Sequence, residues 1–413
     1  MNRQSKVTTD SYDGFRQILG GMDPQAFLRD YWQKKPLLIR NALPNFKTLV
    51  QPNELAGLAL ESEVESRLVT EKVTAKNKAQ RWQLKTGPFT AKDFKALPKT
   101  HWTLLVQAVD HFLPQVAALR ERFRFIPDWR IDDVMISYAS DQGSVGPHVD
   151  NYDVFLLQGL GMRRWQVGGA PMAEEILIEG CPLRVLRSFK ADQSFELHVG
   201  DILYVPPRFA HWGVSLGDGM TYSIGFRSPS CADLLATHME QLLANLGEQD
   251  RLTDPWLKLQ SHPAEIRPEA IKYVVDWLLS NQPNPNEVQH WFGKMVTSPK
   301  TGKEPGYEAL SNKEARALFG RYVKQGSRTA KKPLYLMRSE DARIAFIDAK
   351  DGVLLFVNGE EFLLSKNAKN FVAVLAGAFR INPAGLAPFL PDYESLLVSL
   401  LQAGVFYITD ELE

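Results

Sequence analysis

The chain has 413 residues, 48 of them basic and 48 acidic, and contains two cysteines. This length exceeds one ordinary domain, and the balanced charge gives no global reason to expect a nucleic acid or an anionic membrane as partner, so any such contact would have to be local. Two cysteines exclude a disulfide framework and a cysteine-based zinc site, and since neither a secretory pattern nor a run of about eighteen apolar residues occurs, we expect a soluble cytoplasmic protein.

Residues 1–125 predict a mixed region of helices and strands. A short β-like run covers residues 36–39, and apolar residues at helical spacing cover 54–60 and 102–119. We interpret this region as an N-terminal α/β scaffold.

Residues 126–228 change to a β-rich texture. Turn residues, among them the glycines of 159–161 and the Gly200-Asp201 pair, separate short runs that favour strands. These runs are IDDVMISY, YDVFLLQG, RRWQVG, PLRVLR, FELHVGDILYVP, HWGVSL and MTYSIGF. So many short strands in about a hundred residues indicate a barrel or a sandwich.

Helical patterns return in residues 229–307. Apolar stripes occupy 232–246, 269–279 and 286–296, and Pro268 stands where the first turn of a helix tolerates proline. We expect these helices either to pack on the barrel or to pair between two copies of the chain. Residues 308–413 then give a helix, strands within 344–364 and two further helices, an order that suits a small winged-helix module.

A candidate metal site begins with His148 and Asp150, in the segment GPHVDNYDVF. In an extended backbone, residues two apart point to the same side, so both side chains can reach one ion. Two histidines and one carboxylate are a common iron(II) site that leaves coordination positions open. His211, which follows the Pro206-Pro207 turn and opens the next strand, is the best second histidine.

Other histidines are weaker candidates. A His-x-Asp pair alone is a common pattern; here its place between a glycine-rich loop (143–146) and a strand favours a metal site. His198 could also be a ligand, but we interpret it as a strand residue before a turn. The remaining histidines fall in predicted helices or their connections.

A second expected feature is a cation for an acidic cosubstrate. If 2-oxoglutarate chelates the iron, its far carboxylate needs a buried partner, because an unpaired buried charge is expensive. Arg163 and Arg164 are the candidates, and strand alternation sends them to opposite faces. Periodicity alone does not choose between them; if Trp165 belongs to the core, Arg163 lies inside with it.

Several segments together resemble the JmjC-type ribosomal oxygenases. The resemblance covers at least residues 25–228 and runs through YWQKKPLLIRNA, ELAGLALESEVESRLV, HWTLLVQAVDHF, DWRIDDVMIS, GSVGPHVDNYDVFLLQGLGMRRWQVG and GDILYVPPRFAHWG. It implies an α+β protein with a double-stranded β-helix of the cupin type, a helical dimerisation region at 229–307 and a C-terminal winged helix at 308–413. The loop at Asp141-Gln142 departs from the glycine- and proline-rich form of the family, which affects local loop shape only.

The resemblance also implies an activity and its residues. His148, Asp150 and His211 would hold Fe(II), Arg163 would meet the distal carboxylate of 2-oxoglutarate, and Ser137 would contact it as well. Dioxygen would be the oxidant, and the substrate an arginine of ribosomal protein L-sixteen, hydroxylated at its β carbon. The protein is then expected to be a homodimer.

Three other functions remain open at this stage. A non-redox metal-binding cupin would use the same three ligands, and a JmjC demethylase would share the hydroxylation chemistry. A nucleic-acid-binding regulator is disfavoured, because residues 345–413 hold four basic and nine acidic residues. Selection of an arginine substrate needs acidic or aromatic groups at the barrel mouth, and the candidates are Tyr138, Asp141 and Tyr152.

Overall fold

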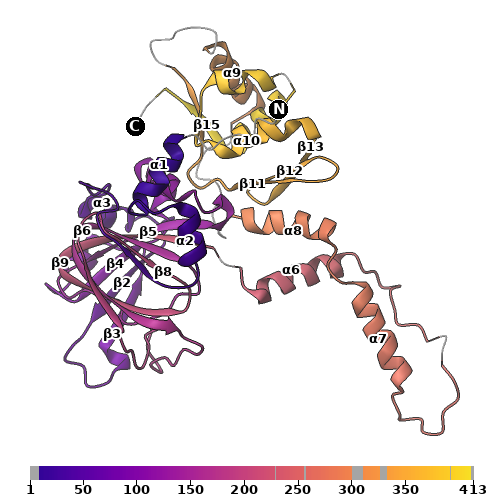
Figure 1. The fold of residues 1–413 in the computed structure, drawn as a ribbon, viewed down its shortest axis with the longest axis horizontal. Helices are drawn as coiled ribbons and strands as arrows, with labels where there is room; N and C mark the ends of the chain where they lie inside the picture. The colour runs from indigo at the N-terminus through magenta and orange to yellow at the C-terminus, as the bar shows by residue number, and fades with distance from the viewer. Residues whose placement is uncertain are drawn as a thin grey trace.

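The computed structural model describes residues 9–227, 229–254, 257–299, 310–325, 333–390 and 392–410. Three parts follow one another along the chain: a β-rich body, a helical arm that projects from it, and a C-terminal α/β domain above the body (Figure 1). Some residues of the predicted helical region and C-terminal module, 300–309 and 326–332, lie outside this description.

One nine-stranded antiparallel sheet forms the body, in the order β1-β8-β6-β9-β5-β4-β2-β3, with β7 paired to β6. Four of its strands precede residue 126, so the sheet continues from the N-terminal region into the β-rich region. The strands are β1 (Leu37–Ile39), β2 (Ser66–Glu71), β3 (Trp82–Thr86), β4 (Trp102–Val106), β5 (Ile131–Ala139), β6 (Val154–Pro171), β7 (Gln193–Leu197), β8 (Ile202–Val205) and β9 (Phe209–Phe226).

The turn that we predicted at 159–161 is wrong, because β6 is one strand through these glycines. The pairing of β6 with β9 shifts register here, at a β-bulge. Gly161 has φ +65°, and a Cβ added there would lie 2.1 Å from the carbonyl oxygen of Asp218. Glycine is therefore required for the bend, and it makes two β-like runs look separate in the sequence.

Two further secondary-structure predictions are wrong. Residues 102–106 form strand β4 instead of the start of a helix, since they pair with β2 on one side and β5 on the other. Residues 182–187 form no strand; they make a single isolated bridge, Leu177 to Leu186. In both places tertiary pairing, and not local pattern, decides the structure.

The helices before β5 cover one face of the sheet. They are α1 (Thr9–Ile18), α2 (Pro24–Asp30), α3 (Pro52–Leu58), α4 (Ala91–Lys95) and α5 (Pro114–Arg120). In α2, the buried Phe27 packs edge-on against Tyr204, with ring centroids 5.0 Å apart. These contacts belong to the largest apolar core of the molecule, which joins the N-terminal helices to β5, β6, β8 and β9.

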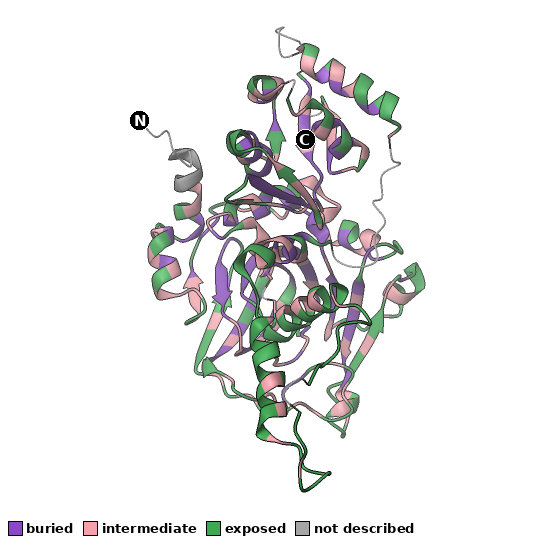
Figure 2. Ribbon diagram, turned by 90° about the vertical axis from the view of Figure 1, so that its right-hand side faces the viewer, coloured by how far each residue is buried: buried purple, intermediate pink, exposed green. Residues whose placement is uncertain are grey.

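The predicted helices after the barrel are present as α6 (Cys231–Ala244), α7 (Pro268–Ser280) and α8 (Pro285–Thr297). Helix α8 packs against the body and against the C-terminal domain: Phe292 contacts Trp129, and Gly293 lies against the ring of Phe356. Helix α7 projects away from the body and is mostly exposed (Figure 2).

The C-terminal domain has its own apolar core between helices and two small sheets, β14-β10-β15 and β11-β12-β13. It is fixed to the body by buried arginines: Arg120 donates to the carbonyl oxygen of Glu340, and Arg338 pairs with Glu121 at 3.4 Å. Its elements are α9 (Asn312–Gln325), β10 (Tyr335–Arg338), β11 (Ile344–Asp348), β12 (Val353–Val357), β13 (Glu360–Leu364), α10 (Lys369–Gly377), β14 (Arg380–Ile381), α11 (Pro383–Leu386), α12 (Glu394–Gln402) and β15 (Phe406–Thr409). Among the helices of the described residues, none combines the length and apolar character that crossing a membrane requires.

Candidate metal centre

The two sequence-distant parts of the predicted triad are joined by backbone hydrogen bonds. His148 lies in the loop before β6 and His211 near the start of β9, and each donates its backbone N–H to the other's carbonyl oxygen, at 3.0 and 2.9 Å. This bridge places the two imidazoles side by side, with ring centroids 4.3 Å apart. The fold therefore supplies the convergence that the separation of 63 positions conceals in the sequence.

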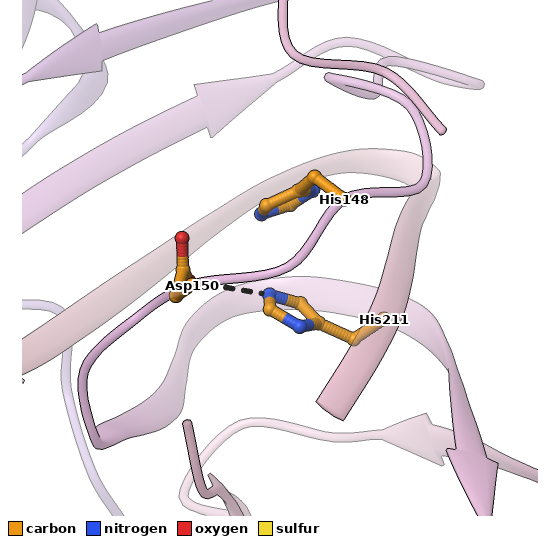
Figure 3. A group of neighbouring side chains, drawn as sticks. All are labelled: His148, Asp150 and His211. Atoms are coloured by element: carbon orange, nitrogen blue, oxygen red, sulfur yellow. Dashed lines mark ion pairs between the residues drawn. The ribbon is translucent and has the colours of Figure 1, made fainter. Parts of the chain in front are cut away.

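Asp150 completes the group. One ligand atom from each of the three side chains lies within 4.8 Å of the others, and Asp150 Oδ2 is 3.5 Å from His211 Nε2 (Figure 3). Between His148 and Asp150, Val149 turns the other way and packs with Leu186. This is the alternation expected of an extended segment.

Backbone carbonyls orient both histidines. Nδ1 of His148 lies 2.9 Å from the carbonyl oxygen of Gly146, and Nδ1 of His211 lies 2.9 Å from that of Phe209. A carbonyl only accepts, so each Nδ1 carries the proton and each Nε2 has a free lone pair. Such contacts fix the tautomer and the ring orientation of metal-binding histidines.

The protonation states also suit ligation. Burial, assisted by the neighbouring His211, lowers the pKa of His148 to about 4. Burial opposes ionisation of Asp150, but the proximity of His211, His148 and Tyr152 holds its pKa at about 2. At neutral pH the site thus offers a neutral imidazole and a carboxylate, the forms that bind metals.

Arg163 lies inside the barrel beside the triad. Its side chain is buried, and Nη1 donates to the hydroxyl oxygens of Ser137 at 3.2 Å and Thr221 at 3.3 Å. Among the described residues no carboxylate pairs with it, and its Nε has no hydrogen-bond partner. Burial lowers its pKa to about 10, which still leaves a cation at neutral pH. A buried cation whose only partners are hydroxyl groups is an expected site for an anion.

A tryptophan contacts both this cation and the metal group. The guanidinium of Arg163 lies 5.0 Å from the ring centroid of Trp165, and that ring lies 5.8 Å from His211. A Cβ added at Gly213 would come within 2.7 Å of Trp165 and 2.8 Å of Arg163 Nε. Glycine at this position therefore leaves the space that both side chains occupy.

The structure separates the candidates that the sequence left open. Arg164 is exposed and pairs with Glu196 at 2.8 Å, so Arg163 is the inward residue. His198 is exposed, and His211 is the second histidine near the pair. Thr221 was missed; its signal was its place in a β-like run, where register puts it opposite Ser137 and Gln158.

The three candidates for substrate selection occupy different places. Tyr152 is 43% exposed and lies close enough to Asp150 to help lower the pKa of that carboxyl, so it lies at the edge of the metal group. Asp141 accepts a hydrogen bond from the backbone N–H of Gly217 at 2.8 Å. The ring of Tyr138 packs on Trp102, with centroids 5.3 Å apart. Of the three, only Tyr152 has a contact with the triad that the structure records.

The fold and the site define the JmjC class of metal-binding barrels, and residues 118–234 match the family model described as JmjC domain. The relatives narrow the class. The chain is 40% identical, over 71% of its length and 79% of the relative, to the ribosomal protein uL16 3-hydroxylase of Escherichia coli (strain K12). It is 44% identical, over 51% of each, to the probable ribosomal oxygenase of Haemophilus influenzae.

Solved structures agree with these relatives. The ribosomal oxygenase YcfD of Escherichia coli in complex with cobalt and 2-oxoglutarate superposes with a TM-score of 0.76, at 33% identity, over 94% of this chain and 98% of that one. Another YcfD structure gives 0.79 at 32% identity, over the same shares of the two chains. The chain belongs to the ribosomal oxygenase family.

Proposed function

We propose that the chain is an Fe(II)- and 2-oxoglutarate-dependent oxygenase that hydroxylates the β carbon of an arginine in ribosomal protein L-sixteen (uL16). The observation that carries this proposal is the pairing of a three-residue metal group with a buried, uncompensated cation inside one barrel. The substrate follows from the relative named as a uL16 3-hydroxylase.

The residues present fit a ferrous ion. His148, Asp150 and His211 supply two nitrogen donors and one carboxylate, a set known from non-haem iron oxygenases that leaves positions open for other ligands. Both histidines have their Nδ1 engaged by backbone carbonyls, so Nε2 is the atom that each offers to the ion.

The neighbouring residues fit 2-oxoglutarate. Arg163, through its unpartnered Nε and the Nη1 group, would bind the distal carboxylate, and the hydroxyl groups of Ser137 and Thr221 would complete the contact. The relative's structure with cobalt and 2-oxoglutarate supports this assignment at the level of the ligand pair.

When bound, iron and 2-oxoglutarate together supply the activation of dioxygen that hydroxylates a carbon. The chain contributes position and environment. The bridge between His148 and His211 holds the two histidines side by side, and the buried Arg163 would hold the far carboxylate of the cosubstrate. Trp165 packs against both Arg163 and His211, and Tyr152 lies beside the carboxylate of Asp150 at the open edge.

The remaining architecture is also proposed. The apolar face of the helical region, residues 229–307, would form a homodimer, and residues 308–413 would be a winged-helix module that makes protein contacts. Together with the 1–125 scaffold and the 126–228 barrel, this gives four parts. A ribosomal substrate places the reaction in the cytoplasm.

The test uses purified protein, Fe(II), 2-oxoglutarate and recombinant ribosomal protein L-sixteen. We expect succinate formation that depends on the substrate, and fragmentation should locate one added oxygen on an arginine β carbon. Succinate without oxygen in the protein, or no turnover by an iron-loaded preparation, would contradict the substrate assignment. A non-redox cupin would form no succinate, and a demethylase would remove a methyl group from a methylated peptide.

A further inference from the structure

A basic surface lies on the N-terminal part of the sheet. Residues 72–99 contain eight Lys or Arg residues and one acidic residue, whereas the other positions of the chain contain 40 and 47. The net charge of this segment is therefore +7 and that of the rest of the chain is −7. The two cancel, so the neutral total does not reveal the basic segment. We call residues 72–99 the basic surface.

Six of these lysines come from two parts of the segment, and a groove lies beside them. The hairpin loop between β2 and β3 carries Lys72, Lys76 and Lys78, and helix α4 with its flanks carries Lys92, Lys95 and Lys99. A groove of about 580 Å³ lies between the outer face of β2–β3 and α4, and Lys72, Lys85 and Thr74 are among its lining residues. The charged residues that line the groove, Lys72, Lys85, Glu71 and Asp93, balance one another, so the positive charge comes from the lysines of the adjoining loop and helix.

Most of these charges are uncompensated. Arg81 pairs with Glu71, and Lys85 pairs with Asp93. The other six lysines are exposed, and none has an ion pair with a carboxylate of the described residues. They are Lys72, Lys76, Lys78, Lys92, Lys95 and Lys99. Six free ammonium groups in one short segment create a positive potential that favours a polyanion.

The aromatic residues of the surface indicate what kind of polyanion fits. Trp82 and Phe89 are buried, and Phe94 is half-buried, so no fully exposed ring is offered for stacking. Single-stranded nucleic acids are usually bound on exposed aromatic rings, whereas a double helix is bound through its phosphates. The composition of this surface favours phosphate contacts alone.

The surface adjoins the segment that carries the metal ligands. The groove ends at His101, whose backbone N–H donates to the carbonyl oxygen of Asp141 at 2.9 Å. Asp141 begins the loop that leads to His148. A polyanion on the basic surface would therefore be held next to the loop that leads into the metal centre, on the opposite face of the sheet.

We propose that the basic surface binds the phosphate backbone of double-helical RNA. The choice of RNA over DNA rests on the proposed function, because a ribosomal protein binds RNA in the ribosome. The expectation that the chain has no direct nucleic-acid contact came from the whole-chain charge and from the acidic C-terminal residues 345–413, neither of which describes this surface.

The experiment measures binding of the full chain to a labelled hairpin RNA between 50 and 200 mM salt by fluorescence anisotropy. Two variants remove charge from separate elements: K72Q/K76Q/K78Q from the hairpin and K92Q/K95Q/K99Q from α4. The logarithm of the binding constant falls linearly with the logarithm of the salt concentration, and each lost phosphate contact makes this slope shallower by about one. Each variant should therefore make the slope shallower by about three. The matched control, K258Q/K350Q/K366Q, removes three exposed lysines elsewhere and should leave the slope unchanged.

Absence of RNA binding at 50 mM salt, or an equal loss in the control variant, would overturn the proposal. A DNA duplex of the same sequence that binds as tightly would overturn the choice of RNA, and polyglutamate that binds as tightly would replace it with an acidic protein. Hydroxylation of isolated ribosomal protein is measured separately. If the unaltered chain hydroxylates the ribosomal protein but does not bind RNA, this inference alone is refuted. If it binds RNA but does not hydroxylate, the proposed function alone is refuted.

Discussion

The barrel interior and helix α7 differ in the kind of residue that each buries and exposes. Inside the barrel, polar groups such as His211 and Arg163 are buried, at 1% and 4% exposure. On α7, apolar residues such as Ile271 and Leu278 are exposed, at 56% and 54%. We attribute the polar interior to the proposed ligands, and the exposed apolar residues to the proposed contact with a second copy of the chain. One chain therefore suffices to form the metal centre but not to bury the arm.

The energetic scale supports this distinction. Full burial of a large aliphatic side chain is worth about 1.5–3 kcal/mol, so the exposed apolar residues of α7 represent several kcal/mol that one chain leaves unused. A second copy of the arm is the simplest cover, because a twofold interface uses each residue twice.

The largest effect is expected when one of the three metal-binding side chains is removed from the barrel interior. His211→Ala should lower Fe(II) affinity and hydroxylation at least 100-fold, because changes to residues that merely support a ligand already cost about 10–100-fold. Anaerobic metal titration and substrate turnover measure the two effects. The far-ultraviolet circular dichroism and the oligomeric state should not change; full activity in this variant would refute the metal assignment.

Arg163 comes next. Arg163→Met removes the buried cation, and the loss of about 3 kcal/mol of charged hydrogen bonding should raise the KM for 2-oxoglutarate about 100-fold while metal affinity is kept. Arg164→Met is the matched control, since Arg164 is exposed on the same strand. Equal effects of the two substitutions would show that the cosubstrate does not meet Arg163.

A substitution in the helical arm should change the oligomeric state and not the metal affinity. Leu278→Asp places a charge in the expected dimer contact of both copies, and the dimer dissociation constant should rise at least tenfold. Light scattering after gel filtration measures it across protein concentrations. Ser280→Asp is the control on the same helix and should leave the dimer intact. A monomer in the unaltered protein would contradict the dimer proposal.

The last prediction concerns the effect of acid on stability. Burial and the neighbouring Arg120 lower the pKa of His111 to about 4, below its ordinary value near 6.5. Between these pH values His111 is protonated in the unfolded chain and neutral in the folded chain. The free energy of unfolding therefore decreases as the pH falls through this window. From pH 7 to pH 5 we expect a loss of about 2 kcal/mol.

His111→Gln should reduce this acid sensitivity, as measured by urea unfolding at both pH values. The charged residues of helix α7, Glu269, Lys272 and Asp276, are all exposed, so acid should act on the body of the molecule before it acts on the arm. An unchanged pH dependence in the variant would show that His111 is not the group responsible.

The comparison also separates what the sequence could and could not predict. The triad was predictable because His148 and Asp150 are two apart in an extended segment, and His211 opens the next strand after a turn. The three helices of 229–307 were predictable from their apolar spacing. Their exposure was not, because an apolar stripe looks the same whether it meets its own core or another chain.

Other features depend on contacts that no local pattern contains. Residues 102–106 have helical spacing, yet pairing with β2 and β5 makes them a strand. The bend of β6 at Gly161 is set by close approach to Asp218, and Thr221 joins the site only through its register with Ser137. The basic surface was hidden because acidic residues elsewhere cancel it in the total.

The assignment of the barrel interior is tested most directly by diffraction from crystals grown with Mn(II) in place of Fe(II) and with 2-oxoglutarate. We predict one anomalous peak bonded to Nε2 of His148, Nε2 of His211 and a carboxylate oxygen of Asp150, with the far carboxylate of 2-oxoglutarate on Arg163. An ion that leaves His211 unbound, or a cosubstrate that does not reach Arg163, would contradict it.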